Sequence, residues 1–101
     1  MNIMDIKPDA EIKPDVDFKR LSVGAHEETL GVVGLLAITH KRVTIVIAED
    51  NEGIFAVGTN ASWPDQDHRP RYGLALARDR ALRNLEVLQD KRDEHLRKAG
   101  R

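Results

Sequence analysis

The stretch that decides the fold runs from residue 43 to residue 57 and reads Val43-Thr-Ile-Val-Ile-Ala-Glu-Asp-Asn-Glu-Gly-Ile-Phe-Ala-Val57. Its first six residues are rich in β-branched side chains, which favour a strand. The cluster from Glu49 to Gly53 holds residue types that form turns, and the extended pattern resumes at Ile54. We therefore predict a β-hairpin over residues 43–60.

A second periodic segment begins at Gly73. Its apolar residues recur every three or four positions and form one stripe along a helix, namely Leu74, Ala77, Ala81, Leu85 and Leu88. This pattern predicts an amphipathic helix from about residue 73 to about residue 96, whose end projects into solvent after Gln89. Hairpin and helix together predict an α+β fold, in which a small antiparallel sheet packs against one long helix.

The N-terminal part of the chain is less regular. Residues 1–17 contain a tandem repeat, Asp5-Ile-Lys-Pro-Asp-Ala10 followed by Glu11-Ile-Lys-Pro-Asp-Val16, with little apolar material to bury. We expect an extended or disordered arm there, with docking on a neighbouring subunit as the alternative. Residues 18–101 are expected to form a single domain.

Within that domain, residues 18–24 alternate weakly and predict a short strand. Residues 26–42 are apolar without two-residue alternation, which fits a buried helix or a buried strand. Acidic residues at the start and basic residues at the end suit a helix dipole, whereas Gly31 and Gly34 argue against a helix. Length slightly favours the helix, and the strand stays open.

Composition excludes several classes of protein. The chain has 101 residues and no cysteine, so disulfides, thiolate metal sites and thiol nucleophiles are ruled out. The longest apolar run, Leu30 to Ile38, is far shorter than the roughly 20 residues of a membrane-spanning helix. The first residues lack the basic start and apolar stretch of a secretory signal, so we expect a cytoplasmic protein.

The net charge of −1 conceals a strong asymmetry along the chain. Residues 43–68 contain five acidic residues and no lysine or arginine, whereas residues 69–101 contain ten basic and five acidic residues. Between Arg69 and Arg83, five arginines are opposed only by Asp79. Such a local cluster can bind anions although the whole protein is not basic.

The predicted junction between the hairpin and the long helix gathers residues suited to a nucleotide. Guanidinium groups match phosphate oxygens in two-pronged contacts, aromatic rings stack on bases, and Asn or Asp can contact a base edge or a ribose hydroxyl. A helix N-terminus adds backbone donors for an anion. We predict phosphate contacts from Arg78 and Arg80 in a binding site made of Phe55, Asn60, Trp63, Asp67, Arg69, Arg71, Arg78 and Arg80.

Plainer interpretations compete with this site. The arginines fit equally a solvated helix face, with Trp63 and Tyr72 covering the core. The sequence Asp65-Gln-Asp67-His68 is the one acid–imidazole cluster and could serve a cation or acid–base chemistry, but a polar loop explains it more simply. The histidines share no metal spacing, and no phosphate-loop or dinucleotide motif occurs. We therefore expect no catalysis, no cofactor and no metal.

Residues 43–85 resemble the C-terminal half of a double-stranded-RNA-binding domain, through the order strand, turn, strand and helix with Ala77, Ala81-Leu82 and Leu85. That family opens its helix with a lysine-rich run that grips phosphates. The corresponding positions read Arg69-Pro70-Arg71 and later Leu74, so Arg71 alone keeps the basic character that the resemblance implies.

Residues 58–81 resemble a pattern of small phage-encoded proteins, the Thoeris anti-defence family, in which a strand, a proline–aspartate loop and a G-x-x-x-A-x-x-R-A helix follow one another. The residues that carry this resemblance are Gly58, Pro64, Asp67, Arg69, Gly73, Ala77 and Arg80-Ala81. The resemblance implies an oligomer that sequesters cyclic ADP-ribose-type signals without catalysis.

The leading expectation is thus a non-enzymatic, homo-oligomeric binder of a small nucleotide or cyclic-nucleotide signal. Self-association also follows from the size of the core, because small domains gain stability by oligomerising. Two alternatives stay open: a module that binds double-stranded nucleic acid, and a protein–protein inhibitor or assembly factor that uses the arm and the helix.

Overall fold

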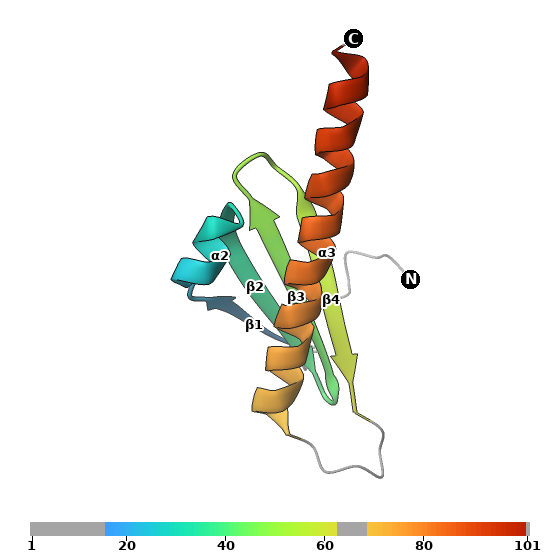
Figure 1. Cartoon of the computed structure of the whole chain (residues 1–101). Coiled ribbons are helices and arrows are strands. Elements are labelled where there is room, and N and C mark those ends of the chain that lie inside the picture. The colour runs from blue at the N-terminus through green and yellow to red at the C-terminus, as the bar shows by residue number, and fades with distance from the viewer. Residues whose placement is uncertain (1–15, 63–68, 101) are drawn as a thin grey trace, which may run out of the picture.

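The computed structural model describes residues 16–62 and 69–100, and Figure 1 shows a sheet crossed on one face by a long helix. In chain order the elements are β1 (Val16–Leu21), α2 (Ala25–Thr29), β2 (Val32–His40), β3 (Val43–Asp50), β4 (Phe55–Ala61) and α3 (Pro70–Ala99). This arrangement confirms the predicted α+β fold class. The predicted arm lies outside the described residues, except for its last two residues, which belong to β1.

The four strands form one antiparallel sheet in the order β1-β2-β3-β4, so each strand pairs with its neighbour in the sequence. The predicted hairpin corresponds to β3 and β4. Its turn is closed by Asp50, whose Oδ1 accepts hydrogen bonds from the backbone N–H of Glu52 at 2.9 Å and of Ile54 at 2.8 Å. Gly53 has φ of +84°, a left-handed conformation that glycine adopts without strain.

The slight preference for a helix over residues 26–42 is wrong. Helix α2 occupies only Ala25–Thr29, and Gly31, with φ of +81°, follows it before β2 begins. Along β2, Leu35 is buried in the core, whereas its neighbour Leu36 lies on the opposite face of the sheet. Both faces of this strand carry apolar side chains, so the alternation that marks a half-buried strand does not occur.

Helix α3 packs directly on the backbone of β4. A Cβ atom added at Gly58 would lie 2.1 Å from the Ala77 carbonyl oxygen and 2.2 Å from the Ala81 nitrogen, so only glycine fits there. Small helix residues thus set the distance between helix and sheet. The buried apolar residues are Val32, Leu35, Ala37, Val46, Ala48, Ala56, Ala77, Ala81 and Leu85.

The helix begins at Pro70, three residues before the predicted start, because proline is favoured in the first turn of a helix. At its other end α3 continues past the sheet (Figure 1), and residues 93–100 are all exposed. Among the described residues, no helix combines the length and the hydropathy that crossing a membrane requires.

Candidate functional site

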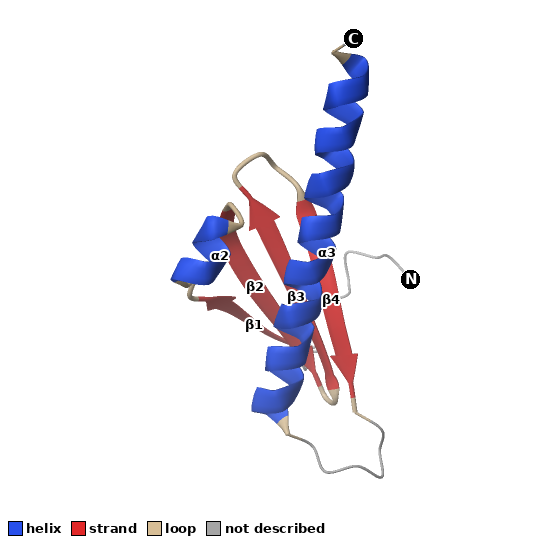
Figure 2. Ribbon diagram, in the orientation of Figure 1, coloured by secondary structure: helices blue, strands red, loops and turns tan. Residues whose placement is uncertain are grey.

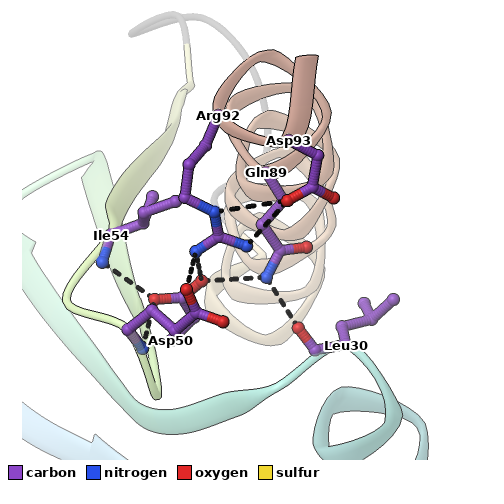
Figure 3. A network of polar contacts seen from close by, with 7 residues as sticks. Leu30, Asp50, Ile54, Gln89, Arg92 and Asp93 are labelled. Carbon is purple, nitrogen blue, oxygen red and sulfur yellow. Dashed lines mark hydrogen bonds and ion pairs between the residues drawn. The ribbon is translucent and has the colours of Figure 1, made fainter. Parts of the chain in front are cut away.

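A buried carboxylate connects α3 to the hairpin turn through hydrogen bonds and an ion pair (Figure 3). Asp50, at the end of β3, is 2% exposed. Its Oδ2 accepts hydrogen bonds from Gln89 Nε2 at 3.1 Å and from Arg92 Nη1 at 3.4 Å, while Oδ1 caps the turn. Gln89 Nε2 also donates to the Leu30 carbonyl oxygen at 2.7 Å, which connects the start of β2 to the same cluster.

Burial alone would raise the pKa of Asp50. The hydrogen bonds from Gln89 and from the backbone of Ile54 and Glu52, with the charge of Arg92, outweigh burial and hold the pKa below its ordinary value. Both carboxylate oxygens are occupied by donors of the chain itself. We therefore assign this cluster to holding the fold together rather than to binding.

A second ion pair joins α2 to α3. Arg78 donates to the carboxylate of Glu27, and its Nη2 also donates to the Ser22 carbonyl oxygen at 3.1 Å. A hydrogen bond from the backbone N–H of Glu27 itself is the largest cause that lowers the pKa of this carboxyl; burial opposes it, and Arg78 adds to it. The guanidinium of Arg78 is thus engaged with the chain itself.

The end of β4 meets the first turns of α3 through Asn60 and Arg80. Arg80 Nη1 donates to the Thr59 carbonyl oxygen at 2.7 Å and to Asn60 Oδ1 at 3.3 Å. A Cβ atom added at Gly73 would lie 3.0 Å from Asn60 Nδ2, so the absence of a side chain lets the asparagine lie against the helix. This junction holds Asn60 in place and keeps Arg80 at the surface.

The start of α3 has an unusual charge. Arg69 is the N-cap residue, its side chain makes no capping hydrogen bond, and Arg71 follows Pro70 in the first turn, which contains no acidic residue. Helix N-termini carry a partial positive charge and normally attract acidic side chains. The two arginines instead add positive charge to the positive end of the helix. Tyr72, beside them, is 63% exposed.

The arginines of the junction differ in their partners from Arg78, Arg83 and Arg92, the other arginines in the body of α3. Arg78, Arg83 and Arg92 each pair with a carboxylate. Within residues 16–62 and 69–100, no carboxylate forms an ion pair with Arg69, Arg71 or Arg80. These three guanidinium groups are therefore open to an external anion, as is that of Arg97 in the last turn of the helix. We call Asn60, Arg69, Arg71, Tyr72 and Arg80 the junction site.

Of the eight residues that the sequence singled out, the structure brings Asn60 and Arg80 into contact, while Arg69 and Arg71 lie at the start of the same helix, about two to three turns before Arg80. Phe55 is 59% exposed but lies at the other end of β4, on the face of the sheet away from α3. Arg78 points toward α2. Trp63 and Asp67 lie outside the described residues, as do Asp65 and His68 of the acid–imidazole cluster.

Sequence reasoning missed Tyr72, which the plainer interpretation assigned to covering the core. Its place in the first helical turn could have been found from Pro70, because proline marks the start of a helix. In the described part of the chain, no group of three or more His, Asp or Glu side chains is arranged to hold a metal ion.

The chain matches no protein-family model, no curated protein and no solved structure.

Proposed function

We propose that the protein binds a small phosphate-bearing nucleotide at the junction site and sequesters it without chemical change. The observation that carries this proposal is the start of α3, where two arginines without a described carboxylate partner stand at the positive end of a 30-residue helix. Like charges at a helix N-terminus cost a few tenths of a kcal/mol to about 1 kcal/mol each. A bound phosphate would turn that cost into an attraction.

The contacts available at the junction suit a nucleotide better than a simple anion. Arg69 and Arg71 offer guanidinium forks to phosphate oxygens. Arg80 begins about 14 Å further along the helix than Arg71, at a rise of about 1.5 Å per residue, and its side chain reaches the end of β4. About two and a half turns separate Arg71 from Arg80, so the two side chains leave opposite sides of the helix. A ligand that contacts both would have to pass around the start of the helix and is therefore much longer than one phosphate. Tyr72 offers an exposed ring on which a base can stack.

Asn60 supplies the polar contact that distinguishes one nucleotide from another. Its Oδ1 faces Arg80, and its Nδ2 lies beside Gly73 at the first turn of α3. An amide fixed in this way can read a base edge or a ribose hydroxyl. The resemblance to Thoeris anti-defence proteins favours cyclic ADP-ribose-type signals as the ligand. Binding without turnover would then lower the free concentration of the signal, as an anti-defence protein requires.

Calorimetric titration tests the proposal with ADP-ribose, cyclic ADP-ribose and cyclic mononucleotides as probes. We expect at least one probe to bind in the micromolar range, and Arg71→Ala to weaken it about tenfold or more, because one charge-assisted contact is lost. Arg97→Ala is the matched control, because Arg97 lies in the exposed last turn of the same helix. Absence of any binding tighter than about 1 mM would refute the proposal.

Double-stranded nucleic acid is the second candidate, favoured by the same two arginines at the head of a helix that follows a β-sheet. Duplex binding predicts that the logarithm of the affinity falls steeply with salt, by roughly one unit of slope per phosphate contact. A gel-shift titration at low salt separates the two candidates. A duplex shift that Arg71→Ala removes, with no binding of the small nucleotides, would favour this candidate.

A further inference from the structure

The face of the sheet away from α3 is apolar over all four strands. Alternate residues point to this face, which we call the outer face, and the register places Phe18, Ile38 and Ile45 in one row and Leu36, Ile47 and Val57 in the next. Phe18 is 65% exposed and Val57 is 46% exposed. The apolar residues of the outer face are Phe18, Leu36, Ile38, Val43, Ile45, Ile47, Phe55 and Val57.

No described element covers the outer face. Helix α3 crosses the opposite face (Figure 2), and the ion pair of Glu27 with Arg78 fixes α2 on that same side. Strands of a sheet that faces water on one side normally alternate apolar and polar residues. The central strands β2 and β3 instead carry apolar residues on both faces, the pattern of a sheet that is buried on both sides.

The size of the outer face fits a protein interface. Four strands spaced about 4.8 Å apart, with side chains over three successive rows, give a footprint of roughly 20 Å by 20 Å. This projected area of roughly 400 Å² is about half of the roughly 800 Å² of accessible surface that each partner buries in a stable complex, so a polar rim around the apolar rows would have to contribute the rest. Exposed apolar patches of this size mark interaction sites.

The charges on the outer face indicate what covers it. Its strand positions include two charged residues, Arg20 on β1 and Glu49 on β3, one of each sign. In a two-fold symmetric contact, residue i of one copy meets residue j of the other and the reverse. Arg20 of each copy can therefore meet Glu49 of its partner, so the face is complementary to itself. A strongly acidic partner would place like charge against Glu49, and a strongly basic partner would place like charge against Arg20.

A hollow in the outer face would receive a side chain from the facing sheet. It has a volume of about 540 Å³ and is lined by residues of the outer face, among them Arg20, Leu36 and Glu49, and by Leu21, Val23 and Leu35, which pack toward the core. Two features of the backbone create it: β1 ends at Leu21 while β2 continues, and Gly34 contributes no side chain. The exposed phenyl rings of Phe18 and Phe55 are the side chains that a second copy could insert into the hollow.

We propose that the outer face is the interface of a symmetric homodimer in which two sheets pack face to face. Each copy buries its apolar rows against those of the other, and the hollow beside Gly34 accepts a phenyl ring. The junction site lies where β4 meets α3, and α3 runs over the opposite face. Dimerisation therefore leaves the junction site of each copy accessible, and the two proposals stand independently.

The test measures the mass of the full chain by sedimentation equilibrium between about 1 and 200 µM. We expect a dimer, twice the monomer mass of 11.4 kDa. Val57→Lys should raise the dissociation constant about 100-fold, because the substitution occurs twice in the dimer and each lysine costs roughly tenfold. Val87→Lys is the matched control, because Val87 is 51% exposed on α3 and should leave the dimer unchanged.

A second variant covers the case in which Val57→Lys does not fold. Gly34→Val narrows the hollow, because it adds three carbon atoms to its floor. A Cβ added there would meet only Glu49 Oε1, at 3.7 Å, and Gly34 does not have a positive φ, so the strand tolerates the change. We expect it also to weaken the dimer. Any of three results would overturn the proposal. The wild type could be a monomer at 200 µM, both variants could leave the dimer intact, or Val87→Lys alone could disrupt it.

Discussion

Replacing Asp50 by asparagine tests how much of the fold depends on one buried carboxylate. Asp50→Asn keeps the size of the side chain but replaces one carboxylate oxygen by an amide NH₂ group. Donors already surround both oxygens: the backbone of Glu52 and Ile54 on one side, Gln89 and Arg92 on the other. An NH₂ group at the position of Oδ1 or of Oδ2 would face these donors and could accept a hydrogen bond from none of them.

The expected cost follows from what is left unsatisfied. Hydrogen bonds to a charged group contribute about 1.5–3 kcal/mol each, and removing one partner of a buried ion pair typically costs 3–5 kcal/mol. Asparagine keeps one acceptor oxygen, so we expect Asp50→Asn to lower the free energy of unfolding by about 3 kcal/mol. For a small domain with a total of roughly 5–10 kcal/mol, this is a large fraction.

Urea unfolding at pH 7 and fixed protein concentration measures the change. The matched control is Glu52→Gln, which removes one of the two other carboxylates that pair with the same arginine, the second being Asp93. Glu52 lies closer to Arg92 Nη1, at 3.1 Å against 3.4 Å for Asp50, but its side chain is 60% exposed. Exposed ion pairs contribute about 0–1 kcal/mol, so the control should change little. Equal effects of the two substitutions, or a loss below about 1 kcal/mol for Asp50→Asn, would refute the reasoning.

The remaining predictions concern acid and the approach of the helix to the sheet. Because the pKa values of Glu27 and Asp50 are lowered in the fold, both carboxyls stabilise it above their ordinary pKa values of 4.5 and 3.8 and lose that contribution as the pH falls below them. Urea unfolding from pH 7 to pH 3 should show this loss, and a flat profile would contradict it. Gly58→Ala should destabilise the fold by about 3 kcal/mol or prevent folding, because its Cβ would overlap the helix backbone. Gly34→Ala, whose Cβ would meet only Glu49 Oε1 at 3.7 Å, should change the unfolding free energy of the monomer by less than about 1 kcal/mol when both variants are compared below the concentration at which the proposed dimer forms; similar losses for the two alanine variants would count against direct packing of helix on strand.

Local patterns made the hairpin and the long helix predictable. The β-branched run from Val43, the turn residues around Gly53 and the helical stripe from Leu74 each express their structure within a few neighbouring residues. Strand β2 was harder because its alternation is absent: Leu35 faces the core while Leu36 lies on the apolar outer face. A strand that is apolar on both faces has the same sequence signal as a buried helix.

The candidate site was predictable in outline and not in detail. The order of strand, polar loop and arginine-rich helix placed Asn60 and Arg80 at one junction, where the two side chains are hydrogen-bonded. The sequence could not distinguish Arg78 from Arg80, because the partner of Arg78 is Glu27, 51 residues away in the chain. Only the packing of α2 beside α3 brings that carboxylate to one arginine and leaves the other on the edge of β4.

Binding of a phosphate-bearing nucleotide where β4 meets α3 can be followed by titrating the ¹⁵N-labelled full chain with cyclic ADP-ribose and recording its amide resonances. We expect saturable shifts concentrated at Asn60 and at Arg71 to Gly73, which Arg71→Ala reduces and Arg97→Ala leaves unchanged. Resonances that do not move up to about 1 mM ligand, or saturable shifts confined to the outer face of the sheet, would contradict binding at this junction.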